Sequence, residues 1–156
     1  MRVIECEKSF QDLKTRLTSA PILKAPDFSK PFLLQTDASL TGLGAVLTQL
    51  DDQLREHPVV YLSKQLKPSE KNYAISELEC LAIVWSIGKL RYYLQGRKFT
   101  VITDHKALQW LDKTKLSNSK LMRWSLLLQE FNFDIQYRKG ICNTNADSLS
   151  RICISN

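Results

Sequence analysis

Two apolar segments joined by a short polar turn, between residues 32 and 47, constrain the fold of this chain more than any other stretch. Residues 32–34 are apolar and lead to Asp37, and Pro31 and Gly42 bound the first segment. This pattern predicts a β-hairpin whose first strand ends on a carboxylate. A lone acid on a buried strand is costly unless a hydrogen-bonding turn, a basic partner or a metal ion compensates its charge. The hairpin therefore predicts a compensating group elsewhere in the chain.

Beyond the hairpin, strand patterns and helical patterns alternate. A polar loop at 51–58 precedes the third strand, and a basic, proline-containing loop at 64–72 follows it. Hairpin-joined strands pair antiparallel, whereas helix-separated strands favour parallel pairing. The order therefore predicts an α/β fold with a mixed five-stranded sheet, three antiparallel strands and then parallel ones, flanked by helices. The hairpin within 32–47, whose first strand ends at Asp37, supplies two of the expected strands, and the others are 59–62, 99–103 and 133–137. The expected helices are 8–20, 76–94, 106–111, 117–131 and 144–151.

The segment 76–94 is predicted to be the longest helix. Ser76, followed three residues later by Glu79, fits a capping box, and Gly96 lies just beyond the predicted end. Apolar residues occupy nearly every face of this segment, which indicates burial on more than one side, against the sheet. Cys80 lies within it and is predicted to be a small core residue.

Composition limits the class of protein. With 156 residues and a hydrophobic fraction of 44%, the chain is long enough for one domain with a proper core. The formal net charge of +6 favours an anionic partner, of which nucleic acid is the commonest. No apolar run is long enough to span a bilayer and residues 1–5 lack the shape of a signal peptide, so we expect no membrane partner. The 4 cysteines form no Cys-x-x-Cys pair, which favours a reducing intracellular compartment over a zinc site or disulfide framework.

The N-terminal region is expected to be a junction. Pro21 ends the helix predicted at 8–20, and Pro26 and Pro31 then punctuate an extended connector. The predicted division of the chain is a linker helix and connector at 1–31, a main domain at 32–152 and a tail at 153–156.

Acidic residues stand where predicted strands end and helices begin. Asp37 ends the first strand, Asp104 ends the fourth, and Asp147 begins the last helix. In an α/β sheet such positions collect at one edge, where ligands bind. The central helix adds Glu77 and Glu79, which point to nearly opposite sides at about 100° per residue, so only one of them can join the cluster.

Several carboxylates in one cleft repel one another unless they are neutralised, and their hard oxygen ligands suit Mg²⁺ or Mn²⁺. Two divalent ions roughly 4 Å apart, bridged by a shared aspartate, are a common arrangement for phosphodiester hydrolysis. Ordinary structural roles are the alternative: Asp37 can cap a turn, Asp104 or an acid near Asp147 can cap a helix, and Glu79 can complete the capping box. The gathering of these acids at one predicted edge favours the metal site.

The chain carries a series of longer motifs in a fixed order. They are Ala-Pro-Asp-Phe-Ser-Lys-Pro-Phe (25–32), Thr-Asp-Ala-Ser (36–39), Gly-Leu-Gly-Ala-Val-Leu (42–47), Glu-Lys-Asn-Tyr (70–73), Glu-Leu-Glu-Cys-Leu-Ala-Ile-Val-Trp (77–85), Thr-Asp-His-Lys-Ala-Leu (103–108), Tyr-Arg-Lys-Gly (137–140) and Asn-Ala-Asp-Ser-Leu-Ser-Arg (145–151). From residue 28 to residue 151 the sequence resembles the RNase H domain of reverse transcriptases from gypsy-class long-terminal-repeat retrotransposons. The resemblance implies an RNase H-like fold within a larger polyprotein.

The resemblance also implies a role for each acid. Asp37 matches the aspartate that bridges both metal ions, and Glu79, rather than Glu77, matches the helical glutamate. Asp104 matches the acid on the metal ion that serves the leaving group, and Asp147 matches the acid on the metal ion that holds the nucleophilic water. The implied cofactor is a pair of Mg²⁺ ions, for which Mn²⁺ can substitute.

One position departs from cellular and retroviral RNases H, which place a histidine ten positions before the last aspartate. That position is Tyr137 here, and a tyrosine with a pKa of about 10 is a poor general base. Tyrosine at this position resembles the gypsy class. His105 follows Asp104 and is interpreted as a first-turn residue that orients the neighbouring loop.

Candidate substrate contacts lie around the acids. Gly42 and Gly44 would let a nucleic-acid backbone approach the second strand closely, and ordinary strand or bulge geometry is the alternative. The candidate contacts to substrate, with a solvated loop as the alternative for the basic ones, are Lys113, Lys115, Lys120, Arg123 and Tyr137. The neighbouring Trp110 and Trp124 are predicted to be core residues.

The expected function is endonucleolytic hydrolysis of the RNA strand of RNA–DNA hybrids by two-metal-ion catalysis, as part of retrotransposon reverse transcription. The implied partners are the hybrid, recognised by its shape and 2′-hydroxyls, and the polymerase portion of the same polyprotein. The alternative is a weakly active or inactive RNase H-like module for nucleic-acid binding or polymerase assembly, which the presence of all the acids disfavours. The expected location is intracellular, in the cytoplasm within a virus-like particle, and the sequence does not specify an oligomeric state.

Overall fold

The sheet is built outward from the hairpin. In the computed structural model, which describes residues 23–104 and 119–138, β1 (Phe32–Ala38) and β2 (Gly42–Leu50) pair antiparallel along their whole length. Ser39 closes the turn between them: its backbone N–H donates to the Gly42 carbonyl at 2.9 Å, and its Oγ accepts the Gly42 N–H at 3.0 Å. The predicted hairpin is therefore confirmed, and its turn is held by the side chain of Ser39, two residues after Asp37.

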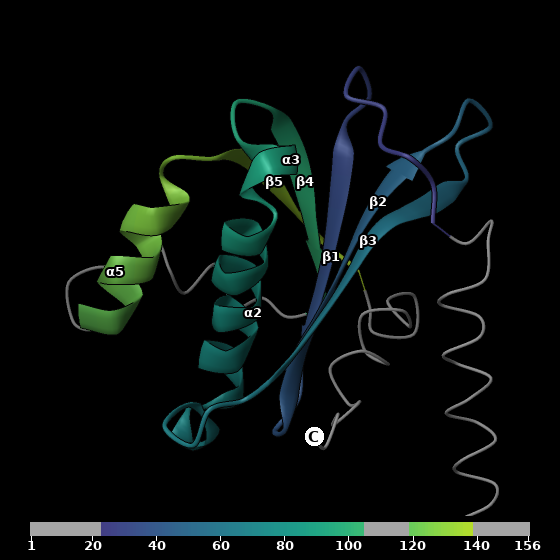
Figure 1. Ribbon diagram of the computed structural model, residues 1–156. Coiled ribbons are helices and arrows are strands. Elements are labelled where there is room, and N and C mark those ends of the chain that lie inside the picture. The colour runs from purple at the N-terminus through teal and green to yellow at the C-terminus, as the bar shows by residue number, and fades with distance from the viewer. Residues whose placement is uncertain (1–22, 105–118, 139–156) are drawn as a thin grey trace, which may run out of the picture.

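The other strands complete a mixed five-stranded sheet in the order β3-β2-β1-β4-β5. β3 (Glu56–Gln65) pairs antiparallel with β2, whereas β4 (Lys98–Thr103) pairs parallel with β1, and β5 (Asn132–Tyr137) pairs parallel with β4. This topology confirms the predicted fold class. Figure 1 shows the strands side by side, with the sheet strongly twisted between β3 and β5.

The third strand is longer than the prediction of 59–62. It includes Pro58, which β3 tolerates because it lies at the edge of the sheet, opposite a register shift between Leu47 and Thr48. The polar loop predicted at 51–58 is correspondingly shorter. The loop predicted at 64–72 begins later and contains the 3₁₀ turn η1 (Glu70–Asn72).

The helix predicted at 76–94 is two helices, α2 (Ile75–Lys89) and α3 (Arg91–Leu94). The break falls at Leu90, whose backbone leaves the helical region with φ −97° and ψ 15°. Gly96 follows α3 with a φ of +74°, as the prediction of a helix-ending glycine requires. The remaining described helix, predicted at 117–131, is α5 (Ser119–Leu128).

The predicted Ser76–Glu79 capping box is wrong. The helix begins one residue earlier, with Ala74 as its N-cap, and Glu77 is the acid that accepts the Ala74 backbone N–H, at 3.1 Å. Alanine has no side-chain acceptor, so only one half of a capping box forms. Glu79 is left free of any capping role.

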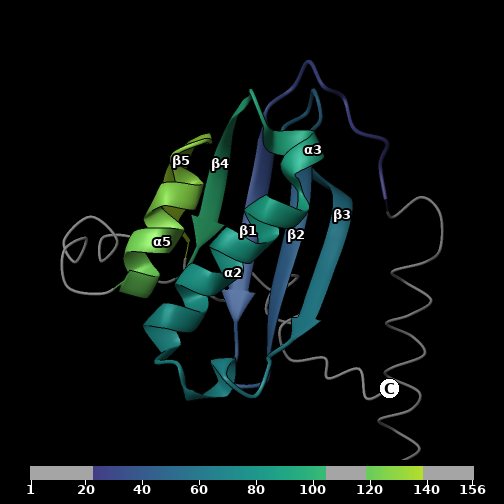
Figure 2. The same ribbon diagram turned by 60° about the vertical axis from the view of Figure 1, so that its left-hand side comes forward.

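The core lies between the sheet and one layer of helices. Figures 1 and 2 show α2 across the middle of one face and α5 beside it on the same face. Trp124 is buried in this layer, as predicted, and burial raises the pKa of the Cys80 thiol to about 12, which agrees with an unreactive core residue. The fully buried members of the core from β1, α2 and β4 include Phe32, Leu34, Ile83, Ile87, Phe99 and Val101.

The connector before β1 is fastened to the sheet. The buried Gln49 amide accepts the Asp27 backbone N–H at 2.8 Å and donates to the carbonyls of Asp27 and Lys30 at 2.7 and 3.1 Å. Phe28 packs edge-on against Phe32, with ring centroids 6.0 Å apart. Residues 27–30 therefore contact the sheet directly, although the predicted domain division itself stays a prediction.

Several sequence predictions lie outside the described residues. These are the helices at 8–20, 106–111 and 144–151, together with Trp110 and His105. Of the helices that the structure describes, none is long and apolar enough to cross a membrane.

Candidate active site

The parallel pairing of β1 and β4 brings two aspartates together at one edge of the sheet. Asp37 is the penultimate residue of β1, opposite Gly44 of β2, and Asp104 directly follows β4. The register from Phe32↔Phe99 to Gln35↔Ile102 keeps the two strands level, so both chains reach this edge together. The sequence predicted this convergence from the strand ends.

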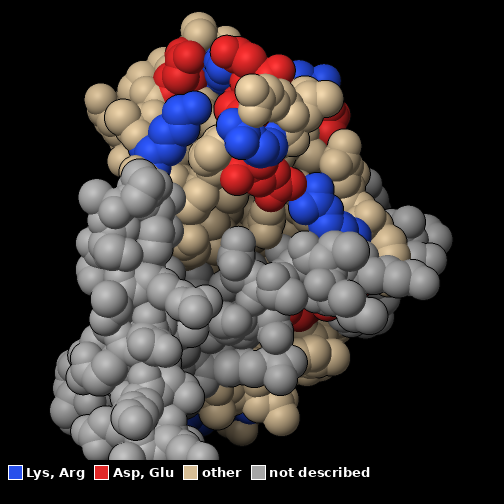
Figure 3. Space-filling model, turned by 90° about the vertical axis from the view of Figure 1, so that its right-hand side faces the viewer, with Lys and Arg blue, Asp and Glu red and all other residues tan. Residues whose placement is uncertain are grey.

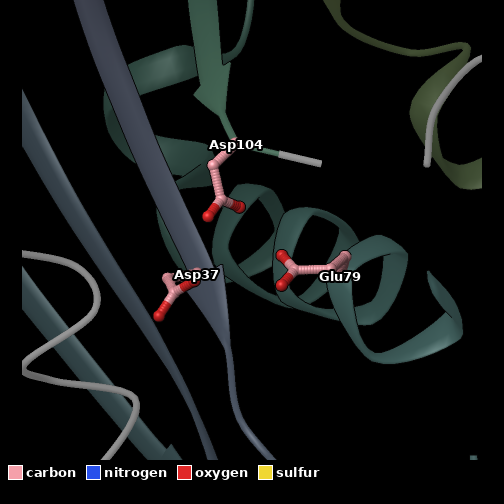
Figure 4. Close-up of side chains that lie close together, drawn as sticks. All are labelled: Asp37, Glu79 and Asp104. Carbon is pink, nitrogen blue, oxygen red and sulfur yellow. The ribbon is translucent and has the colours of Figure 1, made fainter. Parts of the chain in front are cut away.

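Glu79 completes the cluster from the helix layer. One carboxylate oxygen from each of Asp37, Glu79 and Asp104 lies within 4.8 Å of the other two. Figure 4 shows the three side chains approaching a common region from β1, α2 and the end of β4. Asp37 and Glu79 are 6% and 4% exposed, so this is a largely desolvated acidic group.

The environment of Glu79 disfavours its charged form. Burial raises its pKa to about 8, with further upward contributions from the Asp37 and Asp104 charges, and the backbone N–H of Ala38 opposes the shift by donating to the carboxylate. Glu79 Oε2 is buried and has no hydrogen-bond partner among the residues that the structure describes. A divalent cation would supply both the missing partner and the missing positive charge, so this donor set fits such an ion.

The two glutamates of α2 have opposite surroundings. Glu79 faces Asp37 and Asp104, whereas Glu77 lies 2.9 Å from the Lys120 ammonium and caps the helix start. The helical periodicity of the sequence showed only that one of the two glutamates could reach the edge of the sheet that carries Asp37 and Asp104. The structure places Glu79 there, as the family resemblance implied.

The remaining predicted site residues are distributed as follows. Asp147, Lys113 and Lys115 lie outside the described residues. Gly42 and Gly44 are buried in β2, where Gly44 pairs with both Asp37 and Ser63. Tyr137 ends β5 opposite Thr103, the residue before Asp104, so it lies at the same edge of the sheet as the acids. Its side chain is 55% exposed.

The two described basic candidates differ. Arg123 is exposed on α5. The Lys120 ammonium instead lies 3.6 Å from the centre of the Tyr73 ring and 2.9 Å from Glu77. Their contact with substrate stays a prediction.

The sequence analysis did not predict a polar connection between β1, β3 and the end of β5. Glu56, predicted to be in a loop, begins β3; one of its oxygens accepts the side-chain amide of Gln35, and the other lies 2.9 Å from the Arg138 guanidinium. Gln35 is two residues before Asp37, and Arg138 follows Tyr137. A polar Gln35 inside an apolar strand was the available signal, because buried amides need partners.

Positively and negatively charged side chains are intermixed on part of the surface nearest β3. Figure 3 shows Lys and Arg side chains interspersed with Asp and Glu at one end of this face. Ion pairs such as Lys30–Asp52 and Arg55–Asp51, at 2.7 and 2.9 Å, account for mixing of this kind near the β2–β3 turn.

Comparison with known proteins agrees with this geometry. Residues 27–131 match the family model for the RNase H-like domain found in reverse transcriptase. The chain is 45% identical over 151 residues to the retrovirus-related Pol polyprotein from transposon 297 of Drosophila melanogaster, covering 97% of this chain but 14% of that protein. The chain thus spans about one seventh of that relative's length.

Solved structures show the same fold at low sequence identity. Prototype foamy virus protease-reverse transcriptase superimposes with a TM-score of 0.72 at 15% identity, over 86% of this chain and 18% of that one. LC11-RNase H1, solved in complex with an RNA/DNA hybrid, superimposes with a TM-score of 0.56 at 15% identity, over 76% of this chain and 92% of that one. The fold, the acidic edge and the family match agree with the ordered motifs, and the chain belongs to the family of RNase H-like domains found in reverse transcriptases.

Proposed function

We propose that this domain hydrolyses the RNA strand of RNA–DNA hybrids endonucleolytically, with two Mg²⁺ ions as cofactor and Mn²⁺ as a substitute. The observation that carries the proposal is the desolvated group of Asp37, Glu79 and Asp104, with ligand oxygens within 4.8 Å of one another. Retrovirus-related Pol polyproteins and a hybrid-bound RNase H1 among the similar proteins support the substrate class.

Asp37, Glu79 and Asp104 would hold the ions, with Asp147 as the fourth ligand. When bound, divalent ions supply the Lewis acidity that activates water and stabilises the leaving oxygen. Asp37 lies in β1 and Glu79 in α2, so two of the ligands lie on packed elements of the core. Ligands on packed elements would fix the positive charge of bound ions, which favours a transition state in which negative charge develops.

Binding of a cation is also expected to release a proton. The pKa of Glu79 is about 8 because of burial and the Asp37 and Asp104 charges, so at neutral pH much of the metal-free protein holds Glu79 protonated. Exchange of that proton for a divalent ion removes the repulsion within the cluster. The domain would therefore take up Mg²⁺ more readily as the pH rises toward 8.

The partners of the domain are part of the same proposal. The hybrid would lie over the edge that carries Asp37 and Tyr137, with Gly42, Gly44 and Arg123 as candidate contacts, and shape recognition implies little sequence specificity. The polymerase portion of a Pol polyprotein is the proposed covalent neighbour, and an intracellular, cytoplasmic location is proposed with it.

Asp104→Asn tests the function. It should nearly abolish Mg²⁺-dependent cleavage of a labelled RNA–DNA hybrid while circular dichroism shows an intact fold, because it removes a metal ligand without changing volume. Asp134→Asn is the matched control: Asp134 is a half-exposed acid of β5 paired with Lys98 at 2.9 Å, and its loss should leave cleavage unchanged.

Failure of the unmutated protein to cleave the hybrid at any Mg²⁺ or Mn²⁺ concentration would refute catalysis by this chain. Calorimetric titration with Mg²⁺ then separates the alternatives. Absence of binding at millimolar Mg²⁺ would favour a module that serves nucleic-acid binding or polymerase assembly.

A further inference from the structure

The first turn of α2 directly precedes Glu79 and has a weak cap. Its N-cap, Ala74, offers no side-chain acceptor to the helix N–H groups. The backbone N–H groups of Glu77 and Leu78 both donate to the Ala74 carbonyl, at 2.9 and 3.0 Å. The turn therefore lacks the support of a capping side chain, and a contact from outside the helix can stabilise it.

Lys120 of α5 supplies such support. Its ammonium lies 2.9 Å from Glu77 Oε1, while Glu77 Oε2 accepts the Ala74 backbone N–H at 3.1 Å. One carboxylate thus connects α5 to the backbone at the very start of α2. Glu79 lies two residues further along α2, at the start of the next turn.

Two aromatic rings hold the other side of the ammonium. Lys120 Nζ is 3.6 Å from the centre of the Tyr73 ring and 5.6 Å from that of Trp124, within the range of cation–π attraction. The rings themselves meet edge to face, with centroids 6.1 Å apart. The side chains of Lys120 and Glu77 are only 24% and 20% exposed, so solvent screens this pair less than an ordinary surface pair.

We propose that Lys120 and Glu77 form a positioning pair, which fixes the first turn of α2 so that Glu79 is held in place to bind metal. The proposal rests on the proposed function of the acidic cluster. It assigns to Lys120 a role within the fold instead of contact with substrate phosphate. Neither residue touches the reacting atoms; both act through Glu79.

A second ion pair within the helix layer provides a control. Arg91 of α3 lies 2.6 Å from Glu130, just beyond the end of α5, so this pair joins α3 to the C-terminal end of α5. Its side chains are 48% and 52% exposed. Arg91→Met removes an interhelical ion pair of the same type, at a site remote from Glu79.

The experiment compares Lys120→Met, Glu77→Gln, Lys120→Arg and Arg91→Met with the unmutated chain. Calorimetry with Mg²⁺ should show affinity about 10-fold lower for Lys120→Met and Glu77→Gln, the usual effect of losing support for a metal ligand. Arg91→Met should bind Mg²⁺ normally. Lys120→Arg should recover most of the affinity, since arginine keeps the charge and stacks on aromatic rings.

Hydrogen exchange in EDTA provides a readout independent of activity. The amides of Glu77 and Leu78 should exchange faster in Lys120→Met than in the unmutated chain, and Arg91→Met should leave them unchanged. Unaltered exchange and Mg²⁺ affinity in Lys120→Met would overturn the proposal, as would an equal loss of Mg²⁺ affinity in Arg91→Met.

Cleavage kinetics separate the proposal from the phosphate-contact role. A positioning pair predicts that Lys120→Met raises the Mg²⁺ concentration for half-maximal cleavage and leaves the hybrid KM unchanged. A raised KM with a shallower salt dependence and normal Mg²⁺ affinity would instead identify a phosphate contact and overturn the proposal.

If the unmutated chain neither binds Mg²⁺ nor cleaves, the proposed function fails, and the positioning of Glu79 for metal fails with it. Normal activity together with unaltered exchange overturns the positioning pair alone.

Discussion

The two ends of the β1–β2 hairpin both carry carboxylates, but in opposite surroundings. At the β2–β3 turn, Asp51 is surrounded by donors: it accepts the backbone N–H groups of Arg55 and Gln53, at 2.9 and 2.8 Å, and lies 2.7 Å from His57 Nε2. The backbone N–H of Arg55 and then the His57 side chain are the main causes that hold the pKa of Asp51 well below its usual range. The other end carries Asp37, which shares the acidic cluster with Glu79 of α2, and burial and like charges raise the pKa of Glu79 to about 8.

This difference distinguishes an acid that stabilises the fold from one that is suited to bind a ligand. Donors around Asp51 make its charge favourable in the protein alone. Glu79 instead shares a desolvated space with two other acids, and its Oε2 atom lacks a partner within the described part of the chain. A buried carboxylate whose charge the fold disfavours is compatible with a site for a divalent cation.

The largest predicted effect is a gain in stability on removing the Glu79 charge. The pKa of Glu79 is about 8 in the folded protein and 4.5 in its ordinary state, so between these values the folded chain holds a proton that the unfolded chain has released. Stability of the metal-free protein therefore falls as pH rises through this window. At pH 8 and above, Glu79→Gln should be more stable by on the order of a few kcal/mol, with little difference below pH 4.5.

Urea unfolding in EDTA at several pH values measures this effect. The unmutated chain should lose stability between acidic and mildly basic pH, and the Glu79→Gln profile should be flatter. Parallel profiles for the two proteins would show that Glu79 ionises as easily as a surface acid, and the contrast with Asp51 would disappear.

The second prediction concerns metal addition. The proposed function has Mg²⁺ bind the folded site alone, so at ten times its dissociation constant Mg²⁺ should stabilise the unmutated chain by about 1.4 kcal/mol. Glu79→Gln lacks one ligand and should gain less at the same concentration, whereas Asp51→Asn should gain as much as the unmutated chain. Thermal melts at matched ionic strength check this, and an equal gain in all three proteins would mean that Mg²⁺ acts elsewhere.

The elements and two of the acids were predictable because their signals are local. Asp37 and Asp104 follow apolar strand patterns, and the register of parallel strands brings such ends together. The mixed topology followed from the order of hairpins and helices. These inferences depend on patterns of adjacent residues in the sequence and on general rules of strand pairing. They do not depend on how side chains pack.

The rest depends on how elements pack. Whether Glu77 or Glu79 faces the acids depends on the rotation of α2 about its axis, which packing of Ile83 and Ile87 against β1 determines. Ala74 was an unexpected N-cap for α2 because serine is the better one, and the contact at this end is instead the Ala74 backbone N–H donated to Glu77. The sequence predicts a substrate contact for Lys120 from its charge and does not show the Tyr73 and Trp124 rings near its ammonium; that contact stays a prediction. Asp147 stays a prediction.

The smallest predicted effect is at the turn. Asp51→Asn keeps a side-chain acceptor but removes the charge, so part of the hydrogen bonding around it should survive. The pKa of Asp51 is lowered in the folded protein, chiefly by the Arg55 backbone N–H, so its contribution to stability is present above its ordinary value of 3.8 and is lost as pH falls below it. At neutral pH the variant should therefore melt slightly below the unmutated chain, and the two melting temperatures should converge on acidification. The sign is opposite to that of Glu79→Gln at every pH where both acids matter. A gain in melting temperature for Asp51→Asn at neutral pH would mean that the turn disfavours the Asp51 charge. Nearby hydrogen-bond donors would then not distinguish an acid that stabilises the fold, such as Asp51, from an acid of the candidate site, such as Glu79.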